Sequence, residues 1–330
     1  MAWTFELTEG LKNLKIMAES FLKDIPTLGN VYFVFNSTNT YYTQFSKVHN
    51  ITYPDGTSAV HTSLATAIAA CTSGRNDVIL LDANSSHSTA MITMSKSRVH
   101  IVGMDGGGRK NSQGAKISTP ATDVVASVAV ISNTGTRNTF TNIKFIQQGT
   151  NVAQTSAFID TGEGTYCKNC GFEVNSILTT ATQGLLFKGD TCHYEDCQIG
   201  NSTVYHTAAN QAPLVIQTPA RYSYFVNCEI INYSDKTTAS LVDAPDADSV
   251  IGWVKFNNCA LICANLGDWA TAGATIAEGV TSICTSGYLL FDNNCTAFAV
   301  GKFAKADASI LNASGVAVAA AAGWLAIAWA

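Results

Sequence analysis

Charged side chains are scarce in this sequence, and so are prolines and runs of basic residues. Asp, Glu, Lys and Arg make up 13% of the 330 residues, roughly half the share in an ordinary soluble chain. The formal net charge is −5, and no basic run is available to neutralise nucleic-acid phosphates, so we expect no nucleic-acid partner. Hydrophobic residues make up 47%, which is enough for a large core and excludes a disordered chain.

The sequence also shows no secretory signal and no membrane-spanning run. Residues 1–6 do not combine a basic segment with an apolar one. The uncharged stretch of residues 315–330 is shorter than the roughly 18 residues that a span requires. We therefore expect no membrane contact. We interpret the ten cysteines as reduced thiols, because no route to an oxidising compartment is visible.

A repeat becomes visible when six segments are aligned on their cysteines. Each segment carries Asn or Asp two positions after a residue that is mostly aromatic, and a small apolar residue follows directly. The Asn or Asp positions are Asn142, Asn169, Asp196, Asn227, Asn258 and Asn294, and the next positions are Ile143, Cys170, Cys197, Cys228, Cys259 and Cys295. The copies are 27 to 36 residues apart. This spacing is typical of a solenoid repeat.

The chemistry of the repeat indicates a bend within a stacked coil. Apolar residues on the two sides of the Asn cannot share one face of a continuous strand, because side chains alternate along a strand. A tight bend at the Asn returns both groups to the interior, and Asn tolerates the left-handed conformation that this bend requires. Stacked Asn side chains can then form a ladder, with Cys packed just inside it. The sequence predicts an all-β fold, a parallel β-helix.

A second apolar run precedes each bend, and we interpret it as another strand of the same coil. In the last two coils this run nearly merges with the strand before the bend. The runs are Val128–Ile131, Ala157–Ile159, Leu185–Phe187, Leu214–Ile216, Trp253–Val254 and Tyr288–Phe291. One coil cannot bury these side chains alone, but coils stacked at about 4.8 Å form a continuous core.

A zinc site is the alternative reading of the cysteines. Cys167-x-x-Cys170 resembles half of a zinc ribbon. The pair Cys259 and Cys263 has a different spacing, and no clustered His completes a tetrahedral site. We therefore expect structural core thiols, with no metal and no cofactor.

The residues before the first coil predict a helical cap. His61 to Cys71 reads as a short amphipathic helix with Leu64, Ala67, Ile68 and Cys71 on one face, and Asp77–Asp82 follows as a strand. A helix here would cover the apolar end of the cylinder and its unpaired edge. Together with the Asn bends, this arrangement resembles the pectate-lyase-like right-handed parallel β-helix proteins. More narrowly, the Tyr53–Thr57 segment and the Ala-rich tail are similar to virion proteins of tailed bacteriophages.

The resemblance divides the chain into three parts: an N-terminal arm (1–56), the parallel β-helix (57–300) and an apolar C-terminal tail (301–330). The arm contains a predicted strand at Val31–Phe35, and it either anchors the protein or folds back over one face of the cylinder. Apolar and aromatic residues near both ends are candidates for an oligomer interface. They are Trp3, Phe5, Leu11, Trp324 and Trp329.

The resemblance implies a virion protein that is not an enzyme. It would decorate or stabilise a capsid as a homo-oligomer, most simply a trimer, with the major capsid protein or other virion proteins as partners. The alternative is a tailspike or tail appendage that binds or cleaves a host surface polysaccharide. Native mass and glycan cleavage separate the two.

The case against catalysis rests on patterns of the family that this sequence does not show. The carboxylate and Arg arrangement of pectate lyases and the Asp cluster with Gly-His-Gly of polygalacturonases are not found. The best carboxylate group is Glu173, Glu195 and Glu229, on neighbouring coils. A glycosidase holds two carboxyl groups about 5–10 Å apart, which coil stacking can supply. These three residues are the candidates if the chain is an enzyme.

Overall fold

The computed structural model describes most of the chain between Gly29 and Phe298. The described residues are 29–36, 52–83, 86–105, 113–121, 128–175, 181–234, 239–263, 278–282 and 284–292, with shorter pieces at 42–43, 46, 236, 294–298, 302–304, 310–311 and 325–326. Structural statements below concern these residues.

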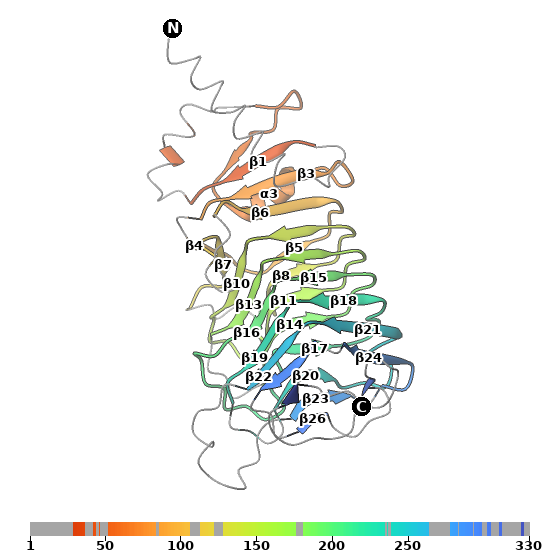
Figure 1. Ribbon diagram of the computed structural model, residues 1–330. Coiled ribbons are helices and arrows are strands. Elements are labelled where there is room, and N and C mark those ends of the chain that lie inside the picture. Colours follow the sequence, from red (N-terminus) through yellow and green to blue (C-terminus); the bar gives the residue numbers. More distant parts are fainter. Residues whose placement is uncertain are drawn as a thin grey trace.

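Three parallel sheets run along one axis and enclose a single core (Figure 1). The chain visits sheets 1, 2 and 3 in turn and then returns to sheet 1 one level further along the axis. All pairings within the sheets are parallel except that of β25 with β28. The predicted all-β parallel β-helix is confirmed.

Sheets 1 and 2 meet at the Asn bends. Sheet 1 consists of β1 (Val31–Val34), β2 (Val60–His61), β3 (Asp77–Leu81), β6 (Val99–Gly103), β9 (Thr139–Thr141), β12 (Tyr166–Lys168), β15 (His193–Glu195), β18 (Ser223–Val226), β21 (Gly252–Asn257), β24 (Gly287–Phe291) and β27 (Ile310–Leu311). Sheet 2 consists of β4 (Ser86–Ser88), β7 (Lys116–Ser118), β10 (Lys144–Gln147), β13 (Gly171–Val174), β16 (Gln198–Gly200), β19 (Glu229–Asn232), β22 (Ala260–Cys263), β25 (Thr296–Phe298) and β28 (Leu325–Ala326).

Sheet 3 closes the cylinder. It consists of β5 (Ile92–Met94), β8 (Ala129–Asn133), β11 (Ser156–Asp160), β14 (Gln183–Phe187), β17 (Leu214–Ile216), β20 (Ser240–Ala244), β23 (Glu278–Ser282) and β26 (Lys302–Ala304). In the last two coils the apolar run merges with the sheet 1 strand before the bend, as the sequence indicates: Trp253–Val254 belongs to β21 and Tyr288–Phe291 to β24. In these coils β20 and β23 supply the sheet 3 strand instead.

Five of the six repeated polar residues occupy left-handed bends. Their φ angles are 57° at Asn142, 50° at Asn169, 54° at Asp196, 53° at Asn227 and 51° at Asn258. Side-chain amides join Asn169 to Asn142 at 2.8 Å and Asn258 to Asn227 at 2.7 Å. Asp196 lies between these two amide pairs.

The sixth position, Asn294, differs from the prediction. Phe291 pairs with Phe256 and Thr296 pairs with Ala260, so the last bend contains one more residue than the bend before it. Asn294 is not among the positive-φ residues that the structure describes. The sequence alignment placed Thr296 opposite Ala260, as the structure has it, but placed Asp292 opposite Phe256, which is one residue out of register on the sheet 1 side.

The thiols form a buried column beside the bends. Cys170, Cys197, Cys228, Cys259 and Cys295 are free and at most 1% exposed. Each donates to a carbonyl of the preceding coil; the Cys228 thiol, for example, lies 3.5 Å from the Tyr194 oxygen. Beside them the Phe225 ring stacks on Tyr194 and on Phe256, with centroids 4.9 and 5.0 Å apart. The repeat thus produces a buried column of cysteine thiols and aromatic rings along the axis.

Helix α3 (Leu64–Ala70) covers the first coil, as the sequence predicts. The Ser63 side chain caps its N-terminus, and Leu64, Ala67 and Ile68 are buried against the core. At the other end of the helix, the Lys96 ammonium donates to the carbonyl oxygens of Ala69 and Cys71. The helix is therefore fixed at both termini.

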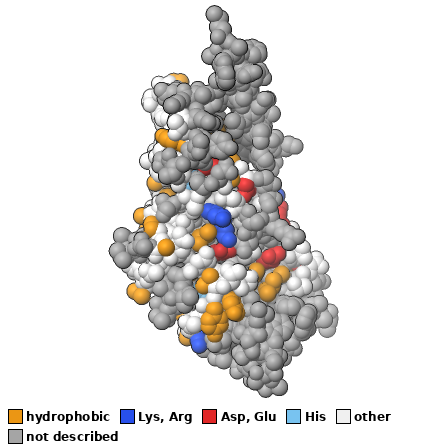
Figure 2. All heavy atoms as spheres, turned by 90° about the vertical axis from the view of Figure 1, so that its left-hand side faces the viewer, with side chains coloured by type: hydrophobic (Ala, Val, Ile, Leu, Met, Phe, Trp, Pro, Cys, Tyr) orange, Lys and Arg blue, Asp and Glu red, His pale blue; other side chains and the backbone are white. Residues whose placement is uncertain are grey.

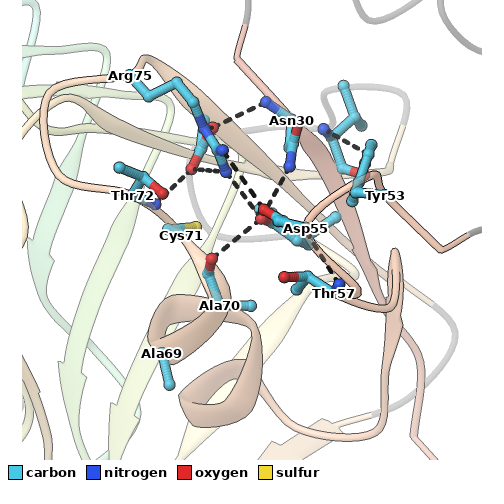
Figure 3. Close-up of polar contacts among 12 residues, drawn as sticks. Asn30, Tyr53, Asp55, Thr57, Ala69, Ala70, Cys71, Thr72 and Arg75 are labelled. Atoms are coloured by element: carbon cyan, nitrogen blue, oxygen red, sulfur yellow. Dashed lines mark hydrogen bonds and ion pairs between the residues drawn. The ribbon is translucent and has the colours of Figure 1, made fainter.

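A buried carboxylate fastens the loop after α3 to the first strands. Asp77 is fully buried and accepts from the Arg75 guanidinium at 2.6 and 2.9 Å and from the backbone N–H groups of Thr72 and Asn30 at 2.6 and 2.8 Å. Figure 3 shows Arg75, Asn30 and Thr72 converging at this point, with Asp55 and Tyr53 beside them. Three separate segments are joined through one side chain.

We expect Asp77→Ala to lower the free energy of unfolding by about 3 kcal/mol, because it leaves the Arg75 charge and two partly buried N–H groups without their acceptor. Chemical denaturation measures this. The matched control is Asp55→Ala, since Asp55 is exposed and lies 3.8 Å from the same guanidinium. Equal losses in the two variants would contradict the assignment.

The outer face of sheet 1 is covered at its N-terminal end. Phe33, Val78, Leu80 and Val102 point away from the main core but are at most 5% exposed, in a second small cluster that includes Tyr42. Strand β1 extends sheet 1 beyond β3 and takes part in this cluster. The division of the chain at residue 56 stays a prediction.

No helix among the described residues is long and apolar enough to cross a membrane.

Candidate functional site

The outer face of sheet 1 is open from β9 to β24. Side chains alternate along each strand, so burial of Cys167, Tyr194, Phe225 and Phe256 in the core turns their neighbours outward. The outward residues of these six strands are half-buried to exposed, and all except Val226 and Leu290 are polar or aromatic. In Figure 1 these strands lie on the side opposite sheet 2.

Four chemically active side chains form a block on two neighbouring strands. Tyr166 of β12 pairs in register with His193 of β15, and Lys168 of β12 pairs with Glu195 of β15. The Tyr166 hydroxyl donates to Glu195 Oε2 at 2.5 Å, and the Lys168 ammonium donates to Glu195 Oε1 at 2.9 Å. Both carboxylate oxygens of Glu195 are therefore held from the preceding coil.

These contacts shift the ionisation of Glu195 and Tyr166 in opposite directions. Partial burial would raise the pKa of Glu195, but the hydrogen bonds from Tyr166 and Lys168 outweigh it and lower the pKa. Burial and the hydrogen bond to the Glu195 carboxylate raise the pKa of Tyr166 far above its ordinary value. At neutral pH the pair is a carboxylate and an intact phenol.

His193 lies between two tyrosines on this face. Its ring centroid is 5.4 Å from that of Tyr166 and 6.0 Å from that of Tyr224. Its Nε2 atom is buried and has no hydrogen-bond partner among the described residues. The block therefore combines a hydroxyl, a carboxylate, an ammonium and an imidazole.

An aromatic track continues from this block toward the C-terminal coils. Tyr222 and Tyr224 are 45% and 36% exposed, and Tyr288 is 50% exposed. The Trp253 ring contacts Tyr222 and Tyr224 edge to face, at centroid distances of 5.8 and 4.8 Å. Trp253 also pairs in register with Tyr288. From β12 to β24 the track spans four coil steps, about 19 Å.

A one-residue bulge places Trp253 against both tyrosines. Ala220 pairs with Val250 and Ser223 with Val254, so residues 251–253 lie opposite residues 221–222. Tyr222 has a φ of 47°, which is uncommon for a bulky residue. Gly252 makes room for it, because a Cβ there would lie 2.6 Å from the Tyr222 ring. Bulges and strained residues cluster at functional sites.

An ion pair lies at the border of the site. Asp190, in the turn before β15, contacts the Arg221 guanidinium of the next coil at 2.7 Å.

The three candidate carboxylates do not come together. Glu195 lies on sheet 1, whereas Glu173 and Glu229 lie on β13 and β19 of sheet 2. Glu173 is 3% exposed and forms an ion pair with Lys144 at 2.8 Å. Figure 2 faces the sheet 2 side and shows a small basic group there, with acidic and hydrophobic side chains around it. Coil stacking therefore places Glu173 and Glu229 on a different sheet from Glu195.

The remaining sequence predictions concern a metal site, the core thiols and an oligomer interface. The described residues contain no cluster of His, Cys, Asp or Glu that could hold a metal ion. Burial raises the pKa of the Cys197 and Cys259 thiols, which keeps them protonated. The interface candidates Trp3, Phe5, Leu11, Trp324 and Trp329 lie outside the described residues.

Comparison with known proteins identifies the architecture. No protein-family model and no curated protein matches this sequence. Among solved structures, a pectin methylesterase from Aspergillus niger is 14% identical with a TM-score of 0.54, over 86% of this chain and 83% of that one. The pectate lyase Pel9A is 16% identical with a TM-score of 0.53, over 82% and 63%. The fold is the right-handed, pectate-lyase-like parallel β-helix.

A further match is the pectin methylesterase PemA from Erwinia chrysanthemi, 13% identical with a TM-score of 0.50, over 87% of this chain and 89% of that one. A phage protein, ORF18 of Geobacillus virus E2, matches with a TM-score of 0.22, which carries no argument. The resemblance to pectate-lyase-like β-helices is thus confirmed for the fold. The narrower resemblance to phage virion proteins stays a prediction.

The prediction that the chain is not an enzyme is wrong on this comparison. The solved structures that share its fold are pectin methylesterases and a pectate lyase. At 13–16% identity the likeness shows the fold alone. The absence of the pectate lyase and polygalacturonase residue patterns therefore does not exclude an enzyme.

Sequence reasoning named Glu195 as outward-pointing but missed its neighbours. Tyr166, Lys168 and His193 each lie one residue from an inward Cys or Tyr of the repeat. The period-two alternation of a strand was therefore enough to mark them as outward. Their proximity required the register between coils.

Proposed function

We propose that this chain binds and processes a polysaccharide along the outer face of sheet 1. The aromatic track carries the proposal: the exposed rings of Tyr222, Tyr224 and Tyr288 and the half-buried ring of Trp253 lie on successive coils beside the Glu195 block. Aromatic rings offer flat apolar surfaces on which the C–H faces of sugar rings stack. A chain of sugars lying along the axis would contact one coil after another.

The charges on this face fit a polar, extended ligand. The Glu195 carboxylate is held by Lys168, and Lys255 lies on the same face, in register with Tyr224. Sites that bind small or repeating ligands combine apolar platforms with a few placed polar groups. The shared fold with pectin methylesterases and a pectate lyase supports a carbohydrate ligand.

The experiment is a binding and turnover screen with pectin, pectate and purified bacterial capsular and O-antigen polysaccharides. Retardation in gels that contain each glycan reports binding, and new reducing ends, released methanol or unsaturated products report turnover. Binding of none of these glycans would overturn the proposal.

We expect Trp253→Ala to weaken glycan binding about tenfold or more, because it removes the ring that both tyrosines contact. The matched control is Tyr233→Ala. Tyr233 and Tyr205 form a similar edge-to-face pair, at 5.2 Å, in the turns between sheets 2 and 3. Affinity gel retardation measures both, and equal weakening in the two variants would place the glycan elsewhere.

The setting of this activity remains a proposal from the sequence. We propose that the chain is a polysaccharide-processing tail appendage of a bacteriophage and that it assembles as a homotrimer on the virion. This proposal combines the predicted virion location with the site described above. For a location on the virion head, the proposal is instead that the chain contacts the major capsid protein. Native mass measurement tests the trimer, and immunogold labelling of particles tests the location.

A further inference from the structure

The open face of sheet 1 carries one carboxylate on its strands. From β9 to β24, Glu195 is the single Asp or Glu among the outward strand residues that the structure describes. Asp190, in the adjoining turn, is engaged by Arg221. Most glycosidases use two carboxyl groups on either side of the scissile bond. Glu173 and Glu229 cannot complete such a pair, because they lie on sheet 2.

Tyr166 supplies what the second carboxylate would provide. An activated nucleophile is recognised by a hydrogen bond to a base, which a third group orients. Tyr166 Oη is 2.5 Å from Glu195 Oε2, and the Lys168 ammonium is 2.9 Å from Oε1 of the same carboxylate. Tyrosine nucleophiles are an established exception to the two-carboxylate arrangement. We propose that Tyr166 is a covalent nucleophile, with Glu195 as its base and Lys168 as the positioning residue.

The reaction balances with Tyr166, Glu195 and one water molecule. Tyr166 Oη attacks the anomeric carbon and forms a C–O bond while its proton passes to Glu195. The glycosidic C–O bond breaks, and the departing oxygen takes a proton from the water molecule. The hydroxide that remains attacks the same carbon, and Tyr166 leaves with the proton returned by Glu195. The net change is hydrolysis of one glycosidic bond.

The electrostatics of the block set the protonation states from which the reaction starts. Glu195 has a lowered pKa and is ionised, while Tyr166 has a raised pKa and stays a phenol until it reacts. His193 lies beside Tyr166 on the next coil, and its ring lines the site between Tyr166 and Tyr224. Tyr224 and Trp253 continue from His193, so a sugar stacked there would adjoin the nucleophile.

This inference rests on the proposed function for its sugar substrate, but it can be tested without one. The probe is p-nitrophenyl acetate, incubated with the full chain at neutral pH. Acetyl transfer to Tyr166 forms an O–C bond, breaks the ester C–O bond, releases p-nitrophenolate and places the phenol proton on Glu195. Peptide mass spectrometry locates the acetyl group.

We expect Tyr166 to be acetylated faster than the more exposed Tyr224 and Tyr288. Glu195→Gln should slow that reaction about 100-fold, the usual contribution of a general base. Tyr166→Phe keeps the ring and should remove the fast phase. Circular dichroism confirms that both variants fold.

Equal rates of acetylation at Tyr166, Tyr224 and Tyr288 would overturn the nucleophile assignment. An unchanged rate of Tyr166 acetylation in Glu195→Gln would also overturn it. Neither result alters the glycan screen, so loss of this inference and loss of the proposed function are distinguishable. A glycan-binding chain with an inert Tyr166 would keep the function and discard the covalent step.

Discussion

Replacing Asp160 with Ala is expected to lower the free energy of unfolding by about 3–5 kcal/mol. Asp160 is fully buried at a core-facing position of β11, where the next coil has Phe187. Its carboxylate accepts from the Tyr194 hydroxyl at 2.6 Å, the Asn133 amide at 2.9 Å, the Gly162 N–H at 3.0 Å and the Thr165 hydroxyl at 3.1 Å. Removing the acceptor leaves these buried donors unsatisfied. Denaturant unfolding of the variant measures the loss.

Asp160→Asn separates the charge from the hydrogen bonds. Burial raises the pKa of Asp160, despite the hydrogen bonds from Tyr194 and Gly162 that lower it. The folded state then binds the proton more tightly than the unfolded state. This stabilisation is complete below the unfolded pKa, about 4, and is lost as the pH rises through the folded pKa.

The amide variant lacks this titration, so its stability relative to the natural chain should increase as the pH rises from about 4. Unfolding curves of both proteins between pH 4 and 8 give the difference. A difference that does not change with pH would show that Asp160 is not held with a raised pKa.

The second large effect is expected at the thiol column. Cys228→Asp places a carboxyl group where the thiol is fully buried and donates to the Tyr194 oxygen. A charge there would be buried among the apolar residues of the core. We expect a loss of at least about 3 kcal/mol in the free energy of unfolding, measured by chemical denaturation.

Cys228→Ser is the control, since its hydroxyl keeps a donor for the same carbonyl. We expect a much smaller loss for Ser than for Asp. A thiol reagent provides an independent check, because buried Cys228 should react only as fast as the protein unfolds. Fast labelling of Cys228 in the folded protein would contradict the inward assignment.

The repeat predicted the coil interior well because its information is local. Alternation on both sides of Asn169 and Asn227 breaks parity at one residue, and a single bend resolves it within the same segment. The capping helix was predictable for a similar reason, since Leu64, Ala67 and Ile68 recur at helical spacing. Neither inference required knowledge of a distant residue.

The errors arose where the coils differ in length. Asn294 was aligned without allowing for the extra residue in the last bend, and the bulge beside Trp253 was not predicted. Apolar character alone does not say which sheet a run joins. Register against the neighbouring coil decides it.

The sequence by itself determined the solenoid, its Asn bends and its inward thiols, because each follows from side-chain alternation within a few residues. Only the tertiary structure decided that Tyr166, Lys168, His193 and Glu195 form one block and that Glu173 faces elsewhere. Lateral neighbours in this fold are about 30 residues apart in the chain, at distances set by turns of unequal length. The site therefore depends on how successive coils align, and this alignment cannot be read from local sequence patterns.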